Sequence, residues 1–373
     1  MKFLVAMDSF KGSLTSKELA DIVGTYLLDR GHRVKSLSLS DGGEGLLDSL
    51  GEALDLDMVE ISVLGPLGEE RRASYAIKED RALIEMARLV GLDLVDKKDR
   101  NPLNISSYSL GQAILDGLDR GVKTFLIGLG GSVSNDMGLG MLMALGYRFY
   151  KEDGSLSGHY GRDLGQIKEI DDSQVDARLK DVKFIVASDV KNPLCGSQGA
   201  SMVFAGQKGA SLEDRRLMDG WFKNLADLVE KTYGIDYRDW PGAGAAGGMG
   251  YAFKSFLKAD LRPGFQLVSS LLSLEEKIDW ADYVITGEGQ LNEQSLMGKL
   301  PVELASLAKK HGKVSIGLFG AIDMDLGKVN DMGLNACFAI SQGPIEEQEA
   351  MNKKVAMKNL QACLSQILNL IEL

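Results

Sequence analysis

An apolar run, a glycine-containing polar turn and a helical segment follow one another near both ends of the chain. Residues 3–7 (FLVAM) are typical of a buried strand, and a helix is expected over about 16–30, with a second strand over 34–40. The rhythm returns late in the chain, where strands are expected over 283–286, 314–319 and 336–340 and helices over 301–311 and from about 346. Strands that alternate with helices predict a parallel sheet covered by helices.

The middle of the chain has a different character. Short strands with tight turns are expected over 58–64, 72–78 and 82–87, in an antiparallel arrangement, and a hairpin over 147–154. Further elements are expected at 106–118 (helix), 183–188 and 201–205 (strands), and 212–233 and 247–257 (helices). Because 373 residues exceed one ordinary core, we expect two α/β domains. A discontinuous doubly wound (Rossmann- or flavodoxin-like) domain would comprise residues 1–57 and 280–373, and a mixed α/β domain, residues 58–279, would be inserted into it.

Composition limits the possible partners. The chain has 45% hydrophobic and 25% charged residues, as globular enzymes do. Its 53 acidic residues exceed its 42 basic ones, giving a net charge of −11, which argues against nucleic acid as a partner. Three widely separated cysteines and the lack of an apolar run near the ~20 residues of a membrane span favour a cytoplasmic protein without a membrane partner. These features do not specify an oligomeric state.

Residues 124–140, TFLIGLGGSVSNDMGLG, combine a short apolar strand, a glycine-rich loop and a helical segment. Glycines let the backbone approach a ligand closely, and N–H groups at a helix start favour an anion. The loop is not the dinucleotide-binding motif, because Val133 stands where its third glycine would be, and the chain has no P-loop motif. Two interpretations stay open: an anion-binding loop, or a tight strand-to-helix turn with an N-cap.

Four apolar strands end in an acidic residue: Asp8, Asp41, Asp189 and Glu288. Ligands of open α/β sheets bind at the carboxyl ends of strands. Carboxylates gathered there would repel one another unless a cation shared the site, and Mg²⁺ takes one or two carboxylates together with phosphate oxygens. Any one such acid is more often a helix N-cap, but four together favour a site. Lysines accompany the glycine-containing turns, and lysine suits phosphate oxygens: Lys11, Lys191, Lys208 and Lys299.

Other potentially reactive residues give weaker signals. The three histidines, His32, His159 and His311, lie in polar surroundings and are expected at the surface, so a serine–histidine mechanism has no obvious base. Cys195 lies in a glycine-containing turn without a histidine nearby, and a packing role is favoured. Residues 242–250 (GAGAAGGMG) fit either a ligand cradle or a closely packed helix start.

Several segments, in their order along the chain, resemble the bacterial glycerate kinase family. They span nearly the whole chain, and the combination is specific although no single segment is. The segments are DSFKGSLTSKE (8–18), SLSDGGEGLLDSL (38–50), IEMARLVGL (84–92), RNPLN (100–104), GLGGSVSNDMGLGMLMALG (128–146), ASDVKNPLCGSQGASMVFAGQKGAS (187–211), GAGAAGGMGYAF (242–253) and ITGEGQLNEQSLMGK (285–299). The resemblance implies two α/β domains, one inserted in the other, and phosphorylation of D-glycerate with ATP and Mg²⁺ in a cleft between them. It favours 2-phosphoglycerate as product over 3-phosphoglycerate.

On this hypothesis Asp189 is the base, assisted by Lys191, and Asp8 and Glu288 hold Mg²⁺. Backbone N–H groups of the glycine-rich loop would hold phosphate, and lysines would neutralise phosphate or the glycerate carboxylate. The residues expected to bind substrate or nucleotide are Lys11, Asp41, Gly43, Gly130, Gly131, Ser132, Asn135, Asp136, Lys208, Gly289 and Lys299.

The chain departs from the family pattern in residues 107–112 and 132–138 and at Asn292, and two of the changed positions concern carboxylates. Asn292 stands where the family usually has aspartate, and Gln112 stands where it often has glutamate. Each of these two exchanges removes a carboxylate. Two alternatives therefore stay open, a kinase of another small hydroxy acid and a non-catalytic ligand-binding relative.

Overall fold

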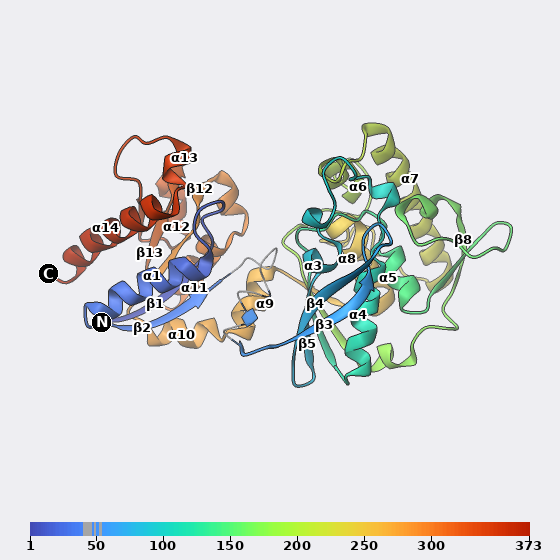
Figure 1. The fold of residues 1–373 in the computed structure, drawn as a ribbon, viewed down its shortest axis with the longest axis horizontal. Helices are drawn as coiled ribbons and strands as arrows, with labels where there is room; N and C mark the ends of the chain where they lie inside the picture. Colours follow the sequence, from blue (N-terminus) through green and yellow to red (C-terminus); the bar gives the residue numbers. More distant parts are fainter. Residues whose placement is uncertain (40–46, 48–49, 52–53) are drawn as a thin grey trace. The chain divides into compact units, whose positions relative to one another are not determined.

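Two sheets organise the chain in the computed structural model, which describes residues 1–39, 47, 50–51 and 54–373. The described residues form two compact sets. Unit 1 contains residues 1–39, 50–51, 54 and 265–373, and unit 2 contains residue 47 and residues 55–264. Each unit has its own sheet and its own helices (Figure 1), so the α/β class predicted from the sequence is confirmed. The predicted domain boundaries stay a prediction.

Unit 1 contains a five-stranded sheet in the order β2-β1-β11-β13-β15, with every pair parallel. Numbered along the chain, this order is 2-1-3-4-5, that of flavodoxin-like doubly wound sheets. The strands are β1 (Lys2–Met7), β2 (Arg33–Ser38), β11 (Tyr283–Gly287), β13 (Val314–Phe319) and β15 (Ala336–Ala339). A two-stranded sheet pairs β12 (Gln290–Asn292) with β14 (Ala321–Asp323).

Helices pack on both faces of the unit 1 sheet. Successive side chains of a strand point to opposite faces: Leu318 of β13 belongs to the core formed with α1 and α14, whereas Phe319 belongs to the core formed with α11 and α12. α1 and α14 lie side by side (Figure 1). The helices are α1 (Ser16–Asp29), α9 (Gly264–Leu271), α10 (Leu274–Trp280), η6 (Glu293–Met297), α11 (Leu300–Lys310), α12 (Leu326–Met332), α13 (Glu347–Ala350) and α14 (Lys353–Ile371).

Unit 2 contains a six-stranded mixed sheet in the order β10-β9-β6-β5-β4-β3. The pairs β3/β4 and β4/β5 are antiparallel, as the sequence predicts for this region, and the pairs from β5 to β10 are parallel. The strands are β3 (Asp57–Leu64), β4 (Glu70–Lys78), β5 (Arg81–Glu85), β6 (Thr124–Gly128), β9 (Lys183–Ala187) and β10 (Asp260–Arg262). A separate antiparallel pair is formed by β7 (Arg148–Lys151) and β8 (Ile167–Asp171).

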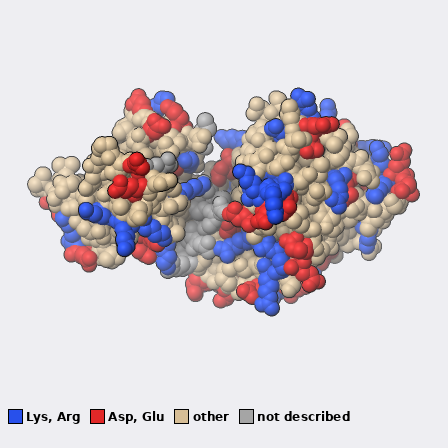
Figure 2. All heavy atoms as spheres, turned by 45° about the horizontal axis from the view of Figure 1, so that its top comes forward, with Lys and Arg blue, Asp and Glu red and all other residues tan. Residues whose placement is uncertain are grey.

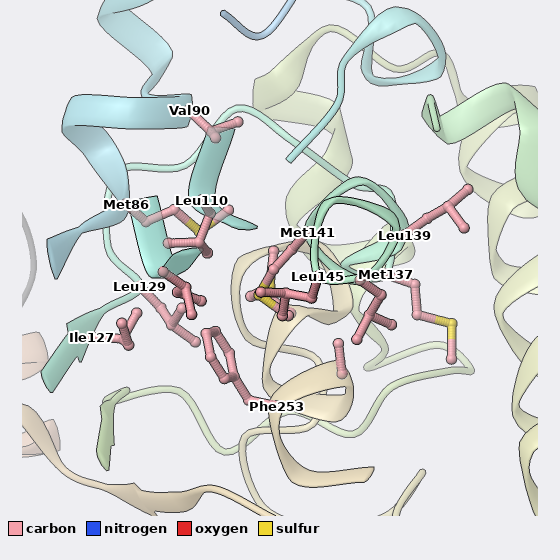
Figure 3. Packing of buried hydrophobic residues seen from close by; sticks show 14 of the residues in the cluster. Met86, Val90, Leu110, Ile127, Leu129, Met137, Leu139, Met141, Leu145 and Phe253 are labelled. Atoms are coloured by element: carbon pink, nitrogen blue, oxygen red, sulfur yellow. The ribbon is translucent and has the colours of Figure 1, made fainter. Parts of the chain in front are cut away.

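The core of unit 2 joins the sheet to its helices. Figure 3 shows part of it, where Ile127 of β6, Met141 of α5 and Phe253 of α8 are among the buried side chains of one cluster. α7 begins with a capping box, in which Ser211 and Asp214 bond each other's backbone N–H groups. The helices are α3 (Met86–Val90), η1 (Leu92–Leu94), η2 (Pro102–Asn104), α4 (Tyr108–Asp119), α5 (Leu139–Ala144), η3 (Gly161–Gln166), η4 (Ala177–Asp181), α6 (Ala200–Phe204), η5 (Ala205–Lys208), α7 (Leu212–Tyr233) and α8 (Ala245–Leu257).

Two local expectations are wrong, those for residues 201–205 and for His159. Residues 201–205 are not a strand but belong to α6 and the start of η5, because the segment packs on α7 and α8 instead of pairing with a sheet. The hairpin expected at 147–154 is confirmed, because an antiparallel bridge joins Tyr150 to Leu156 across the turn, and β7 pairs in addition with β8. His159 is half-buried and bonds Ser106, with 2.8 Å between Nδ1 and Oγ.

Acidic and basic side chains are interspersed over the face shown in Figure 2. Many form exposed ion pairs, such as Arg238–Asp227 in unit 2 and Lys353–Glu18 in unit 1. Such pairs contribute little to stability. An anionic ligand of this acidic protein therefore needs a local group of basic side chains. Among the described residues, no helix combines the length and the apolar character that crossing a bilayer requires.

Candidate functional site

The acidic residues that follow β1 and β11 line one pocket in unit 1. These strands are neighbours, with Met7 paired to Gly287, so Asp8 and Glu288 begin two adjacent loops. The strand order reverses here, because β2 lies on one side of β1 and the later strands lie on the other. Ligands of doubly wound sheets bind outside the carboxyl ends of the strands at such a point. The pocket has a volume of about 750 Å³, and five residues expected to bind ligand or metal line it: Asp8, Lys11, Glu288, Gly289 and Lys299.

Asp8 is held by backbone contacts at the sheet edge. Its N–H donates to Gly287 O at 3.0 Å, and its Oδ1 accepts from the N–H of Ser9 at 2.6 Å. The side chain of Lys11 is exposed, in a turn that Phe10 and Leu14 close through backbone hydrogen bonds. The pocket thus combines a half-buried carboxylate with a lysine at its rim.

Glu288 is buried and engaged through both carboxylate oxygens. Its Oε1 accepts from Ser295 Oγ at 2.6 Å, and its Oε2 accepts from Lys299 Nζ at 2.7 Å. Lys299 is the N-cap residue of α11, and its side chain is 34% exposed, so the ion pair lies where the pocket meets solvent. The sequence predicts both residues as part of the site but not their pairing.

The donor set of this pocket fits Mg²⁺ bound together with phosphates. Among the described residues, no group of three or more histidine, cysteine, aspartate or glutamate side chains could hold a metal ion by itself. Mg²⁺ at phosphate-binding sites needs only one or two carboxylates, since phosphate oxygens and water complete its shell. Asp8 and Glu288 supply carboxylates of that kind.

The two residues that replace a carboxylate of the family pattern accept hydrogen bonds from backbone N–H groups. Asn292 lines the unit 1 pocket and caps η6, with its Oδ1 accepting from the N–H of Gln294 at 3.0 Å. Gln112 joins α4 to β3 in unit 2, with its Oε1 accepting from the N–H of Leu64 at 2.8 Å. Asparagine and aspartate are equally good caps, so the exchange at Asn292 keeps the local structure.

The glycine-rich loop of unit 2 connects β6 to α5. One side of the loop is attached to the segment after β5: Val133 N–H donates to Val90 O at 2.8 Å, and Leu92 N–H donates to Gly131 O at 2.9 Å. Gly130 and Gly131 are half-exposed, whereas Ser132 is buried. α5 has only six residues. Any anion binding here therefore depends on the loop more than on the helix.

Two predicted ligand-binding residues of this loop turn their side chains into the protein. Asp136 is fully buried and accepts hydrogen bonds from Ser107 N–H and Oγ, at 2.8 and 2.7 Å, and from two N–H groups near the start of α5. The pKa of Asp136 is raised above its usual value, because burial disfavours the charged carboxylate. The hydrogen bonds favour the charged form and oppose this shift, but burial has the larger effect. Asn135 Nδ2 donates to Ser201 Oγ at 2.9 Å. These contacts fix the loop from inside.

Lys208 is also buried, with only 2% of the residue exposed. Its Nζ donates to Ser132 Oγ at 3.1 Å and to Ser134 O at 2.6 Å. Burial lowers the pKa of Lys208 to about 7, and the charge of Asp136 partly opposes this shift. The sequence predicts that Lys208 contacts the ligand. In the structure its hydrogen bonds go to the glycine-rich loop.

The glycine-rich segment at the start of α8 packs closely against the same loop. Ala246, Gly247 and Gly248 have left-handed backbone angles, with φ of 49°, 68° and 86°. A Cβ on Gly247 would lie 2.4 Å from Ser134 O, and Gly247 O accepts from Met137 N–H at 2.9 Å. Of the two interpretations left open for residues 242–250, the contacts support close packing.

Asp189 and Lys191 follow β9, whose neighbour in the sheet is β6. Their loop therefore starts at the same sheet edge as the glycine-rich loop. Both side chains are exposed, and Asp189 Oδ1 accepts from Gly264 N–H at 2.8 Å. Asp41 and Gly43 lie outside the described residues.

Sequence reasoning missed a fifth acid at the end of a strand. Glu85 ends β5, next to β6, and is only 2% exposed. Its Oε2 lies 3.5 Å from Arg88 Nε and 3.2 Å from the backbone nitrogen of Leu47, which donates to it. The signal was present, because Ile84-Glu85 is an apolar strand ending in an acid within a segment that carries the family resemblance.

Cys195 is half-buried. Burial and the nearby Asp219 raise the pKa of its thiol to about 12. A thiol with a raised pKa is a poor nucleophile. The packing role favoured from the sequence agrees with this environment.

Comparison with known proteins identifies the family. A model of the glycerate kinase family matches residues 3–372. The chain belongs to the glycerate kinase family. It is 41% identical over 354 residues to the glycerate kinase of Bacillus subtilis (strain 168), covering 94% of this chain and 93% of the relative. It is 40% identical to the glycerate 2-kinase of Escherichia coli (strain K12), covering 93% of each.

A solved structure is also similar. The crystal structure of a protein described as glycerate kinase 2 from Salmonella typhimurium LT2 matches with a TM-score of 0.88 and 36% identity, covering 100% of this chain and 98% of that one. The resemblance stated from the sequence is confirmed. The chain is therefore a kinase, a transferase acting on a small-molecule substrate.

Proposed function

We propose that the protein transfers a phosphoryl group from ATP to D-glycerate, with 2-phosphoglycerate as the favoured product. The observation that carries the proposal is the unit 1 pocket of about 750 Å³, in which Asp8, Glu288 and two lysines meet where the strand order reverses. Phosphoryl transfer requires mainly positioning of the reactants and neutralisation of charge. The name of the relative from Escherichia coli, glycerate 2-kinase, supports the choice of product.

In unit 1, Asp8 and Glu288 would hold Mg²⁺, which when bound neutralises charge on phosphate oxygens. Lys11 and Lys299 lie in the same pocket lining and would bind phosphate oxygens. Gly289 follows Glu288, and a Cβ there would lie 3.4 Å from the backbone nitrogen of Lys11. Lys299 already contacts Glu288. It can therefore hold the carboxylate in one orientation as well as contribute charge.

In unit 2, the half-exposed backbone of Gly130 and Gly131, with Ser132, would hold phosphate. Asp189 would accept the hydroxyl proton of glycerate while that hydroxyl oxygen attacks the γ-phosphorus, and Lys191 would stabilise the added negative charge. The bond between the γ-phosphorus and the bridging oxygen breaks, and ADP leaves with that oxygen. That the reaction takes place in a cleft between two domains, in the cytoplasm, stays a prediction from the sequence.

The test is ADP release by the purified protein with Mg-ATP, with and without D-glycerate, followed by identification of the product. We expect turnover that depends on glycerate, and a product that enolase consumes, since enolase uses 2-phosphoglycerate. A product that enolase does not consume would contradict the proposed position of phosphorylation. Turnover with another hydroxy acid but not with glycerate, or nucleotide binding without any turnover, would refute the proposed reaction.

A further inference from the structure

Lys208 ends η5 inside unit 2 and bonds the glycine-rich loop from the protein interior. Its Nζ donates to Ser132 Oγ and Ser134 O, which both belong to that loop. With 2% of the residue exposed, it differs from Lys191, whose side chain is exposed. Its contacts are thus with the backbone and side chain of a candidate binding loop.

A buried lysine is costly for a fold. Removing an amino group from water is unfavourable unless hydrogen bonds and an opposite charge compensate. Here the charge of Asp136 acts on Lys208, and Asp136 itself is held by Ser107 at the start of α4. Two N–H groups remain on the amine even when it is neutral, so both bonds to the loop persist in either protonation state.

Several neighbouring segments hold the loop. The segment after β5 holds it through the bond from Val133 N–H to Val90 O, while Lys208 holds the neighbouring residues 132 and 134. Ser134 Oγ and Asn135 Oδ1 are buried and lack a hydrogen-bond partner among the described residues. The loop therefore has a polar, incompletely bonded inner side, and Lys208 supplies two of the hydrogen bonds that hold it.

We propose that Lys208 is a positioning residue: it fixes residues 132–134 so that Gly130 and Gly131 present their backbone to a phosphate group, and it does not contact the ligand. The effect on ligand binding rests on the proposed function. The effect on the loop does not. The two parts can therefore fail separately.

The first measurement is hydrogen exchange of the ligand-free protein. Lys208→Met keeps an unbranched side chain of nearly the same length and removes its donors. We expect exchange in residues 130–136 of this variant to be faster by roughly ten-fold or more, the factor expected when a hydrogen bond of this strength is lost. Lys231→Met, an exposed lysine in the last turn of α7 of the same unit, is the matched control and should leave loop exchange unchanged. Unchanged loop exchange in Lys208→Met would overturn the proposal.

The second measurement is steady-state kinetics. A residue that only positions the loop for binding should, when replaced, raise KM for Mg-ATP by roughly ten-fold and leave kcat within about three-fold of the wild type. A purely structural lysine would lower the unfolding temperature without changing KM, which would also overturn the proposal. The two measurements can also give different answers. If loop exchange is faster in Lys208→Met but the wild type shows no glycerate-dependent turnover, Lys208 still positions the loop, whereas the proposed function is refuted.

A double-mutant cycle separates positioning from direct ligand contact. Ser132→Ala removes one acceptor of Lys208 and keeps the backbone N–H groups of the loop. If Lys208 acts through Ser132, the effects of the two substitutions on KM are non-additive. Additive effects, with slow loop exchange retained, would instead assign Lys208 to the ligand. If Lys208→Met does not fold, Ser132→Ala alone must still accelerate exchange of the loop, or the proposal fails.

Discussion

The contact between Gly247 and the glycine-rich loop gives a prediction whose size follows from the geometry. A Cβ at position 247 would lie 2.4 Å from Ser134 O and 2.5 Å from Asn135 Cα, and φ there is +68°. A left-handed backbone costs about 1–2 kcal/mol for a residue with a Cβ. Overpacking against atoms that cannot rotate away adds about 1–3 kcal/mol. Gly247→Ala should therefore cost about 2–5 kcal/mol of unfolding free energy.

Gly234, the C-cap of α7, offers a matched control. Its φ is +69°, nearly that of Gly247, but nothing lies within 4 Å of an added Cβ. Gly234→Ala should therefore show the backbone cost alone, about 1–2 kcal/mol. The difference between the two variants isolates the clash with the loop.

The assay is thermal unfolding of both variants, since about 1 kcal/mol lowers Tm by roughly 2–4 °C in a domain of this size. We expect Tm to fall by roughly 2–8 °C in Gly234→Ala and by more in Gly247→Ala. Because Gly247 contacts residues 134 and 135, only Gly247→Ala should also raise KM for Mg-ATP. Equal losses of Tm in the two variants would refute the argument that close packing on the loop requires glycine at 247.

Two further predictions concern Asp189 and Lys208. Asp189→Asn keeps an acceptor for Gly264 N–H but cannot act as a base, so kcat should fall by about 10²-fold or more with little change in Tm. An effect confined to KM would exclude Asp189 as the base. The pKa of Lys208, about 7 in the folded protein against 10.5 for the free side chain, means that the unfolded chain binds more protons between these values. We therefore expect the difference in unfolding free energy between the wild type and Lys208→Met, measured by urea unfolding, to rise as the pH increases from about 7 to 10.5. A difference that does not change with pH would show that the pKa of Lys208 is unshifted.

Much of the fold could be predicted because it follows local patterns. The apolar runs before Asp8 and Glu288 are β1 and β11, and the helix expected over 212–233 is α7. Residues 201–205 misled because valine and phenylalanine favour strands in isolation, while contacts with α7 and α8 decide the structure.

The site could be predicted only as a set of residues. Strand ends place Asp8 and Glu288 at one edge of a sheet, since parallel strands end together. Polarity alone does not show which way a loop side chain points, so Asn135, Asp136 and Lys208 were expected at the ligand although they are buried. The partner of Lys208 lies 74 residues away, at Ser134, and no local pattern encodes such a contact.

Turnover of Asp8→Asn tests the central claim, that the unit 1 pocket holds the Mg²⁺ that phosphoryl transfer requires. Asp21→Asn, an exposed aspartate on α1 of the same unit, is the control. We expect glycerate-dependent ADP release to fall by about 10²-fold or more in Asp8→Asn, because a charge that holds Mg²⁺ is lost, and to stay at the wild-type rate in Asp21→Asn. Wild-type turnover in folded Asp8→Asn would contradict the assignment of this pocket as the Mg²⁺ site of the reaction.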